Sequence, residues 1–436
     1  MIKYYIQKKL TNVYLFFTLL SLNRNFPFHP EKIKKIQNKR LKKIVKEAYR
    51  IPFYKQRFDA CGITPKDIQT AEDLVKLPVM NKEDYKAVIE ERASKYPYIK
   101  KIFFKHQSSG SSGKPFTSYR SPKAEAYDRA NWIRFSMKNG HNPFFKKTMS
   151  FQNPSLVNVS ESLINKLGLL RRKTLSYTES VDKLIEQYNQ YKPDFMYTTK
   201  SNFMMMILYA KEHNISLHKP RCYCSIGELV EPNERKLMEE ALGKGFFNSY
   251  GSTEAGACTF ITDGAEIHNI SHDTCVINVY NENNELSDTG RFIVTNLWNT
   301  ELPLINYDIG DEGEIITGED GLTYVKRING RCNDWLVFED GSYINYQQFN
   351  VATQTRKDIL QFRFIQEDYH TITVQLVKDT KFDTDTSQIE KELEAEFRKL
   401  IVKDNIQYTF CWLDKIPPEA NGKKRMIISK VKAKAE

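Results

Sequence analysis

Residues 108–114 read Ser108-Ser109-Gly110-Ser111-Ser112-Gly113-Lys114. The two glycines let the backbone approach an anion closely, and a turn of exposed N–H groups forms an anion cradle. The four serine hydroxyls can donate further hydrogen bonds, and Lys114 adds a positive charge. This stretch predicts a loop that grips phosphate groups, and it makes nucleotide chemistry the first hypothesis.

The loop differs from the Walker A motif. Only Ser111 and Ser112 separate Gly110 from Gly113, and Pro115 follows Lys114 instead of a hydroxyl residue. A flexible surface linker is the alternative interpretation. The apolar run at 102–104, which we interpret as a strand, and the proline behind the loop favour a structured phosphate loop.

The composition of the chain indicates a large folded protein. The 436 residues exceed what one core usually supports, so two or more domains are expected. Aromatic residues are abundant, with 24 Tyr and 26 Phe, and nothing indicates disorder. Seven scattered cysteines, an odd number, favour a reduced, cytoplasmic protein. Residues His268 and His272 lie near Cys258 and Cys275, but the sequence between the histidines predicts no stable helix, so we disfavour structural zinc.

The net charge of +11 is concentrated near the N-terminus. Residues 31–50 carry nine Lys or Arg against two Glu, on a predicted helix. This helix could face nucleic acid or an anionic membrane, but a solvated face is the simpler interpretation. No zinc finger or RNA-recognition signature accompanies it, so no nucleic-acid partner is expected. The apolar residues 11–20 are too short to span a bilayer and predict a docked helix or, at most, weak membrane contact.

The order of predicted elements gives the fold class and the domains. Residues 1–95 form a mostly helical lead-in, and from about 100 to 260 helices alternate with short apolar strands, which is typical of a mainly parallel sheet. Strands dominate residues 276–328. The pattern then restarts, so we predict an α/β protein with a large domain at 1–330, a junction at 331–334 and a small α+β domain at 335–436.

Four polar motifs line up along the chain. A glycine-flanked Ser-Thr-Glu in Tyr250–Gly256 can present hydroxyls to phosphate and a carboxylate to Mg²⁺. Residues Tyr307–Asp311 offer a carboxylate suited to ribose hydroxyls. The other two motifs are Gly330–Asp334, at the domain junction, and Pro418–Lys423, which places a lysine on a predicted mobile loop. Each motif alone could be an ordinary turn, but together they indicate one nucleotide site.

The order of these motifs resembles that of the adenylate-forming superfamily, which includes acyl-CoA synthetases and peptide-synthetase adenylation domains. The chain is most similar to the phenylacetate–CoA ligase-like branch and its capsule-biosynthesis relatives. The segments that carry this similarity are Glu47–Tyr54, Leu77–Lys82, Ser225–Glu228 and Leu302–Tyr307. Many relatives have Arg-Tyr-Arg where this chain has Asn306-Tyr307-Asp308, so the site loses positive charge there.

The resemblance implies a role for each motif. Residues Ser108, Ser109, Gly110, Ser111, Ser112, Gly113 and Lys114 would hold the β- and γ-phosphates of ATP. The adenine would lie beside Gly227 and Glu228 and against Tyr250, which begins the Tyr250-Gly251-Ser252 segment of the cofactor site. The catalytic residues would be Thr253 at the α-phosphate, Glu254 as the Mg²⁺ ligand and Lys423 as the mobile lysine. The ribose would be held by Asp311 and Arg331, with the hinge of a mobile C-terminal domain at 331–334. His268 would line the acyl pocket, or would be an ordinary loop histidine.

The resemblance also implies an activity. ATP and a carboxylate substrate would give an acyl-adenylate and pyrophosphate, and the acyl group would pass to CoA, to the phosphopantetheine of an acyl carrier protein, or to an amine. Direct transfer of AMP or an acyl group to another small molecule, without a thioester, is an alternative. A non-catalytic nucleotide-binding protein is another, but the presence of all the motifs argues against it.

Overall fold

The structure is a computed structural model that describes residues 2–107, 117–152, 165, 167–176, 179–230, 232–262, 265–331, 335–339, 343–345, 356, 358–401, 405–417 and 426–431. Its contacts divide the chain into two compact units, Met1–Ile328 and Asn329–Glu436.

The first unit is organised around a large mixed sheet. In the described residues its eleven strands follow the order β10-β11-β12-β13-β9-β8-β7-β6-β5-β3-β4. The strands are β3 (Thr148–Gln152), β4 (Arg172–Ser176), β5 (Phe195–Thr198), β6 (Cys222–Ser225), β7 (Phe246–Ser252), β8 (Gly256–Phe260), β9 (His268–Ile270), β10 (Cys275–Tyr280), β11 (Thr289–Asn296), β12 (Tyr307–Thr317) and β13 (Thr323–Arg331). A separate hairpin contains β1 (Phe104–Gln107) and β2 (Thr117–Arg120).

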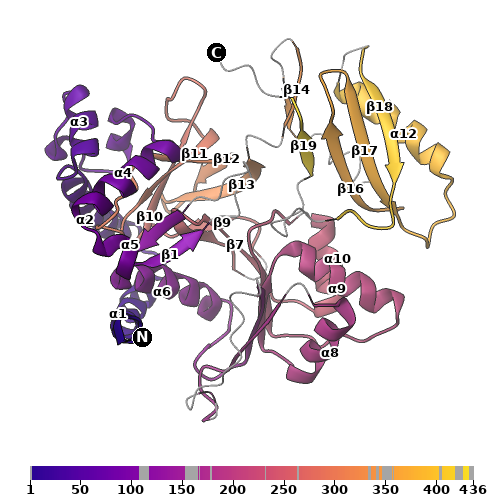
Figure 1. Ribbon diagram of the computed structural model, residues 1–436, viewed down its shortest axis with the longest axis horizontal. Helices are drawn as coiled ribbons and strands as arrows, with labels where there is room; N and C mark the ends of the chain where they lie inside the picture. Colours follow the sequence, from indigo (N-terminus) through magenta and orange to yellow (C-terminus); the bar gives the residue numbers. More distant parts are fainter. Residues whose placement is uncertain are drawn as a thin grey trace. The chain divides into compact units, whose positions relative to one another are not determined.

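One half of this sheet is parallel. Strands β3 to β7 run in the same direction. Every residue of β5 and β6 is buried, as expected for central strands with helices on both faces. Figure 1 shows α8 (Val181–Tyr191), α9 (Lys200–Glu212) and α10 (Pro232–Leu242) on one face and α6 (Pro122–Lys138) on the other. The predicted parallel sheet with helical crossovers is therefore confirmed.

The other half of the sheet is antiparallel and carries the N-terminal helices. Strand β8 pairs antiparallel with both β7 and β9, and β11 pairs antiparallel with both β10 and β12. Helices α2 (Pro30–Ala48), α3 (Pro52–Ala60), α4 (Lys82–Lys95) and α5 (Tyr98–Ile102) lie on this half (Figure 1). Their apolar side chains share one core with β10 and β11, so the lead-in belongs to the first unit.

Two sequence predictions were wrong in detail. Residues 61–81, predicted to be helical apart from a turn at Gly62–Pro65, contain only the short 3₁₀ turns Pro65–Asp67 and Glu72–Lys76 in otherwise irregular chain. The apolar run at 102–104, interpreted as one strand, contains the end of α5 and the start of β1. Short apolar runs fit a helix end and a strand equally well, because only the tertiary contacts distinguish them.

Helix α1 (Ile2–Asn25) packs along α6. Its residues Leu15, Leu19 and Leu22 contact Ile133 and Met137. The predicted apolar stretch at 11–20 is therefore part of a docked helix. No helix in the described part of the chain combines the length and the apolar character needed to cross a membrane.

A buried ion pair joins α6 to the strand connection before β10. The guanidinium of Arg134 donates from Nη1 to Asp273 Oδ2 at 2.8 Å and from Nη2 to Asp273 Oδ1 at 3.0 Å, and neither side chain is exposed. Residue Asn25 of α1 donates to the same carboxylate, and Arg40 of α2 donates to the Asp273 carbonyl. Burial raises the pKa of Asp273, but the Arg134 charge and these hydrogen bonds outweigh it and lower the pKa below its usual value.

The second unit is a small α+β unit. Its four-stranded sheet has the order β18-β17-β16-β19, and α12 (Thr386–Leu400) packs on one face (Figure 1). The strands are β16 (Ile359–Gln366), β17 (Thr371–Lys378), β18 (Gln407–Trp412) and β19 (Ile427–Ser429), with a separate pair, β14 (Trp335–Val337) and β15 (Tyr343–Asn345). The ring of Phe397 on α12 lies 5.2 Å from that of Phe364 on β16, which places the core between helix and sheet.

We predict that Arg134→Met lowers the free energy of unfolding by about 3–5 kcal/mol, because Asp273 would remain buried without its cationic partner. Urea unfolding measures this loss. Arg50→Met is the matched control, since the ion pair of Arg50 with Glu47 is largely exposed and should contribute less than about 1 kcal/mol. Equal losses in the two variants would contradict the prediction.

Candidate active site

A tight turn between β7 and β8 holds the predicted catalytic pair Thr253 and Glu254. The backbone N–H of Ala255 donates to Ser252 Oγ at 3.1 Å, and Asn296 Nδ2 donates to the Ala255 carbonyl at 2.8 Å. Both Thr253 and Glu254 are half-buried. Strand β7 extends through Ser252, so only three residues separate the two strands. The turn is thus fixed at both ends by strand pairing.

The glycines of this motif leave room for neighbouring chain. A Cβ on Gly251 would lie 2.1 Å from the Gly256 carbonyl oxygen, and a Cβ on Gly256 would lie 2.4 Å from Asp128 Oδ1. The backbone of Gly256 also has a φ of +78°, which favours glycine. The same Asp128 carboxylate accepts from the Ala257 N–H at 3.1 Å, so α6 packs directly on the start of β8.

Arg120 ties the hairpin of β1 and β2 to this turn. Its Nη2 donates to the Thr253 carbonyl at 2.8 Å, and its Nη1 donates to Asp128 Oδ2 at 2.6 Å. The hydroxyl of Ser118 donates to the same carbonyl at 3.3 Å. The predicted phosphate loop Ser108–Lys114 lies outside the described residues, but the strands on both sides of it are described. The strand that follows it is therefore anchored to the Thr253–Glu254 turn.

The strand that precedes the loop is anchored to α6. His106 Nε2 lies 2.7 Å from Glu125 Oε2, and Arg129 Nε donates to Glu125 Oε1 at 2.8 Å. Burial raises the pKa of Glu125, but the hydrogen bond with His106 and the nearby positive charges outweigh this effect and lower the pKa to about 2. The carboxylate is thus charged at neutral pH and holds β1 of the hairpin against α6.

Two predicted nucleotide-binding residues are in contact. The hydroxyl of Tyr250, on β7, donates to Asp311 Oδ2, on β12, at 2.8 Å. The ring of Tyr250 meets that of Phe292 edge to face, with 5.7 Å between centroids. Residues that are 61 positions apart in the sequence therefore converge on one place in the first unit.

Two other predicted residues of the first unit, Gly227 and Glu228, lie near the same end of the parallel strands. Strand β6 ends at Ser225, which pairs with Asn248 of β7. Gly227 and Glu228 lie two and three residues after Ser225, and Tyr250 lies two residues after Asn248. Gly227 and Glu228 therefore leave the sheet beside Tyr250. Gly227 is exposed with a φ of +71°, and Glu228 is half-buried. The carboxyl ends of neighbouring parallel strands are the usual place for ligands in such sheets.

Two further predicted site residues, Lys423 and Arg331, have no described side chain. Lys423 lies outside the described residues. Arg331 is the last residue of β13, and its side chain is not among those described. Their assignment to the site stays a prediction, as does the hinge at 331–334.

The two histidines considered as metal ligands have other partners. The Nδ1 atom of His268 lies 2.9 Å from Thr259 Oγ1, and His272 Nε2 lies 2.9 Å from the Thr323 carbonyl oxygen. Burial lowers the pKa of each to about 4, so both are neutral at pH 7. Among the described residues, no group of three or more His, Cys, Asp and Glu could hold a metal ion.

The chain is similar to several known proteins. A family model described as the CapK C-terminal domain matches residues 336–430. Protein CapK of Staphylococcus aureus is 26% identical over 403 residues, covering 87% of this chain and 85% of that protein. The phenylacetate-coenzyme A ligase of Escherichia coli K12 is 23% identical over 385 residues, covering 84% and 83%. The chain is a homologue of CapK and of phenylacetate-coenzyme A ligases.

A solved structure is similar to the fold of the present chain. The 2-hydroxyisobutyryl-CoA ligase in its postadenylation state superposes with a TM-score of 0.71 at 17% identity, covering 91% of this chain and 89% of that one. At this identity the likeness concerns the fold alone. The resemblance to the adenylate-forming superfamily and to its phenylacetate–CoA ligase-like branch is confirmed, and so is the predicted fold class.

In the present chain, Asn306 and Asp308 make structural contacts. The backbone of Asn306 has a φ of +53°, and its Nδ2 donates to the Leu77 carbonyl at 2.8 Å. The backbone of Met80 bridges Asn306 and Asp308, because its N–H donates to the Asn306 carbonyl and its carbonyl accepts from the Asp308 N–H, each at 2.8 Å. The carboxylate of Asp308 binds Arg291 at 2.6 Å. The family segments at 77–82 and 302–307 therefore pack on each other.

Sequence reasoning missed Arg120, Asp128, His106 and Glu125. None of them belongs to a recognisable motif, and their only signal is position: His106 and Arg120 flank the predicted phosphate loop within six residues. They hold the site together through contacts that link α6, the hairpin and the turn.

We predict that Glu125 makes the fold sensitive to acid. Its pKa is about 2 in the folded protein and near 4.5 in the unfolded chain, so its contribution is complete above about pH 4.5 and is lost as the pH falls towards 2. Between about pH 5 and pH 3 this loss should amount to about 2 kcal/mol of unfolding free energy. Urea unfolding across this range should show a smaller pH dependence for Glu125→Gln than for wild type.

Glu83→Gln is the control for this measurement, because the side chain of Glu83 is 77% exposed. It should retain the wild-type pH dependence. If Glu125→Gln also retains it, the anchoring of the hairpin by a charged Glu125 is wrong.

Proposed function

We propose that the protein is an AMP-forming acid–thiol ligase, which activates a carboxylic acid with ATP and passes the acyl group to a thiol. The observation that carries the proposal is the contact of Tyr250 with Asp311 beside the Thr253–Glu254 turn. An aromatic face and a carboxylate at this spacing suit the base and ribose of one nucleotide. The turn adds a hydroxyl for its phosphates and a carboxylate suited to the Mg²⁺ that would accompany them.

The relatives support this choice among activities. The Escherichia coli homologue is named for ligation of phenylacetate to coenzyme A. The 2-hydroxyisobutyryl-CoA ligase, which shares the fold, has been observed in complex with R3-HIB-AMP, an acyl-adenylate. The second supports adenylation as the first half-reaction, and both favour CoA over a carrier protein or an amine as the acceptor.

In the proposed complex each motif contacts one part of ATP. The hydroxyls and backbone N–H groups of the 108–114 loop would hold the β- and γ-phosphates, because such a loop offers many donors to an anion. The adenine would lie against Tyr250, beside Gly227 and Glu228. The carboxylate of Asp311, oriented by the Tyr250 hydroxyl, would accept from the ribose hydroxyls, with Arg331 as a second ribose contact.

Adenylation brings anions together, and the proposed catalytic residues offset their repulsion. A carboxylate oxygen of the acid attacks the α-phosphorus, and the bond from that phosphorus to the pyrophosphate oxygen breaks. The Thr253 hydroxyl would donate to the α-phosphate, and Lys423 would stabilise the charge that develops there. The Glu254 carboxylate suits Mg²⁺, which would neutralise charge on the phosphates when bound.

The second half-reaction needs a different arrangement of the same site. The acceptor thiolate attacks the acyl carbonyl, the bond to the AMP oxygen breaks, and a thioester and AMP result. Because the mixed anhydride hydrolyses readily, water has to be excluded between the two steps. Rotation of the small domain about a hinge at 331–334 would withdraw Lys423 and admit the thiol.

A pyrophosphate-release screen over aryl, fatty, hydroxy and amino acids identifies the acid. Repeating the reaction with CoA, a phosphopantetheinylated carrier protein or a small amine then identifies the acceptor. Release of AMP only when a thiol is present supports the proposal. Transfer of AMP itself onto another small molecule would favour the direct-transfer alternative.

We predict that Lys423→Ala reduces carboxylate-dependent ATP–pyrophosphate exchange by at least about 10²-fold, as expected for loss of a donor aimed at developing charge. Binding of ATP, measured by calorimetry, should remain. Lys424→Ala is the matched control, since it removes the neighbouring lysine. Equal exchange by Lys423→Ala and wild type would remove Lys423 from the mechanism.

We also predict that Glu254→Gln raises the Mg²⁺ concentration needed for half-maximal exchange by about tenfold or more, because a neutral amide is a weaker Mg²⁺ ligand than a carboxylate. The exposed Glu319→Gln variant should match wild type. An unchanged Mg²⁺ titration for Glu254→Gln would refute the metal-binding role.

A further inference from the structure

Helix α1 has a second apolar face that the described residues of the first unit leave exposed. While Leu15, Leu19 and Leu22 pack on α6, the opposite face exposes between 41% and 65% of each of six large apolar side chains. We refer to these six residues as the α1 stripe: Leu10, Val13, Tyr14, Phe16, Phe17 and Leu20.

The stripe is continuous along the helix. Its members at 10, 13, 17 and 20 recur every three or four residues, so they share one side of the helix over about 15 Å. Single exposed apolar side chains are common, but a contiguous patch with two phenylalanines more than half exposed marks an interaction surface.

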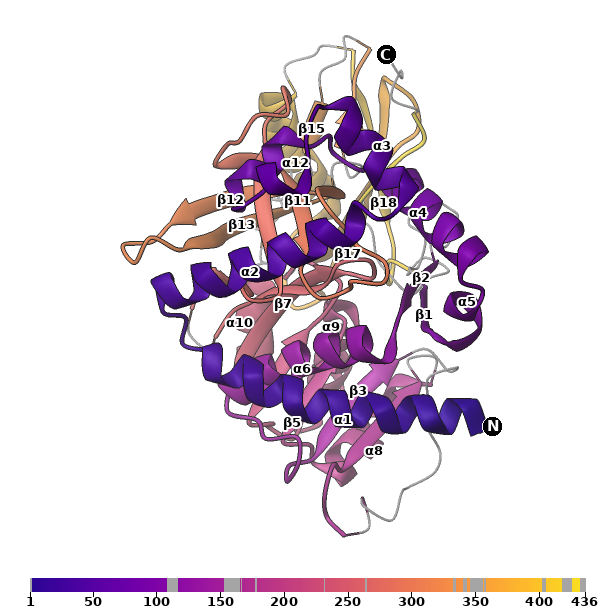
Figure 2. The same cartoon turned by 90° about the vertical axis from the view of Figure 1, so that its left-hand side faces the viewer.

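A dense positive charge lies on the same side of the unit. Figure 2 shows α1 and α2 together on the face towards the viewer, and Lys32 of α2 donates to the Arg24 carbonyl at the end of α1. Seven lysines of α2 are exposed: Lys32, Lys34, Lys35, Lys39, Lys42, Lys43 and Lys46. In the part of the chain that the structure describes, none of them forms an ion pair.

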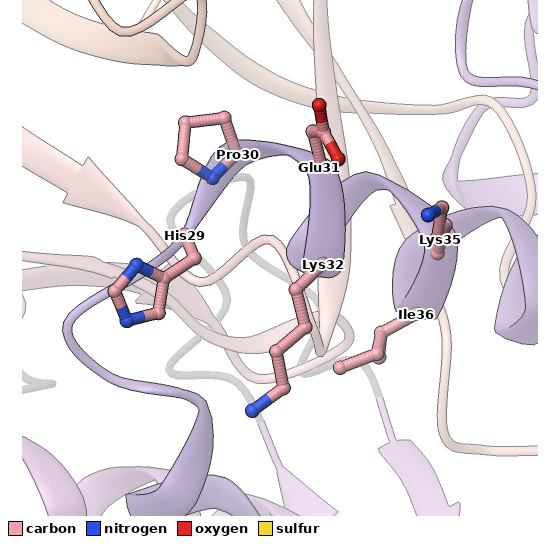
Figure 3. A pocket seen from close by; sticks show the side chains of 6 residues that line it. All are labelled: His29, Pro30, Glu31, Lys32, Lys35 and Ile36. Atoms are coloured by element: carbon pink, nitrogen blue, oxygen red, sulfur yellow. The ribbon is translucent and has the colours of Figure 1, made fainter.

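The surface at the start of α2 has a pocket. An open pocket at the start of α2 is lined by six residues: His29, Pro30, Glu31, Lys32, Lys35 and Ile36. Figure 3 shows Lys32 and Ile36 extending to one side of the helix and Glu31 to the other. The recess thus combines an ammonium group with apolar surface near the end of α1.

We propose that the α1 stripe and the exposed lysines of α2 form a docking surface for an anionic lipid bilayer. The stripe would enter the boundary between headgroups and acyl chains, as aromatic and aliphatic faces of interfacial helices do. The α2 lysines would contact the anionic headgroups, which attract clustered cations at a membrane surface.

The charges favour a bilayer over the other occupants. A second copy bound through the same surface would bring two α2 helices with like charge together, which is unfavourable. Nucleic acid would match the lysines but would leave the stripe in water. Only an anionic lipid surface complements both parts, and the proposal does not depend on the enzymatic activity.

Flotation of the full-length protein with vesicles tests the proposal. We expect binding to vesicles of phosphatidylcholine with about one third phosphatidylglycerol, and at least about tenfold weaker binding to phosphatidylcholine alone or at high salt. The double variant Phe16→Ser/Phe17→Ser should bind the anionic vesicles at least about tenfold more weakly, because it loses most of the apolar insertion. The triple variant Lys39→Gln/Lys42→Gln/Lys43→Gln should lose about fivefold per lysine.

Phe145→Ser is the matched control, because Phe145 is 61% exposed and lies in the connection between α6 and β3. It should bind vesicles like wild type, and circular dichroism should give all variants the wild-type melting temperature. Failure of wild type to bind anionic vesicles at low salt, or equal binding by the Phe16/Phe17 variant and the control, would overturn the proposal. So would a wild-type dimer in light scattering that this variant converts to a monomer, since the stripe would then join two copies.

Discussion

The buried ion pair of Arg134 with Asp273 is the constraint on which the first unit depends. Two full charges out of water need compensating hydrogen bonds: both carboxylate oxygens of Asp273 bind the guanidinium, whose Nη1 and Nη2 also donate to the Leu22 carbonyl and to Asn131 Oδ1, while Nε has no partner among the described residues. Because Arg134 lies on α6, the pair fixes that helix against the sheet. Two other α6 side chains, Asp128 and Asn131, then bind the N–H and the carbonyl of Ala257, at the start of β8.

The candidate site inherits its rigidity from α6. Through Asp128 the helix orients Arg120, which holds the Thr253 carbonyl, and through Glu125 it holds His106 of β1. Both strands that flank the proposed phosphate loop are thus anchored to α6. The turn with Thr253 and Glu254 lies where the sheet changes from parallel to antiparallel, so strand pairing fixes it at both ends.

Local patterns predicted most of the fold. Helices alternate with the short strands β5 to β7, as predicted for residues from about 100 to 260, since buried apolar runs between turn residues have few other solutions. Errors occurred where two local solutions compete. The run at 102–104 divides between a helix and a strand. Residues 61–81 have helix-forming residues, but they form mostly irregular chain whose apolar side chains share a core with α2 to α4.

The sequence by itself determined the mainly parallel sheet, the strand-rich segment at 276–328 and the similarity to adenylate-forming enzymes, because each depends on residue type and short spacing. Only the tertiary structure decided how these motifs meet. The bond from Tyr250 to Asp311 and the tie from Arg120 to Thr253 span 61 and 133 positions. Such contacts leave no local pattern, because any two strand ends could in principle be neighbours until the order of strands in the sheet is known.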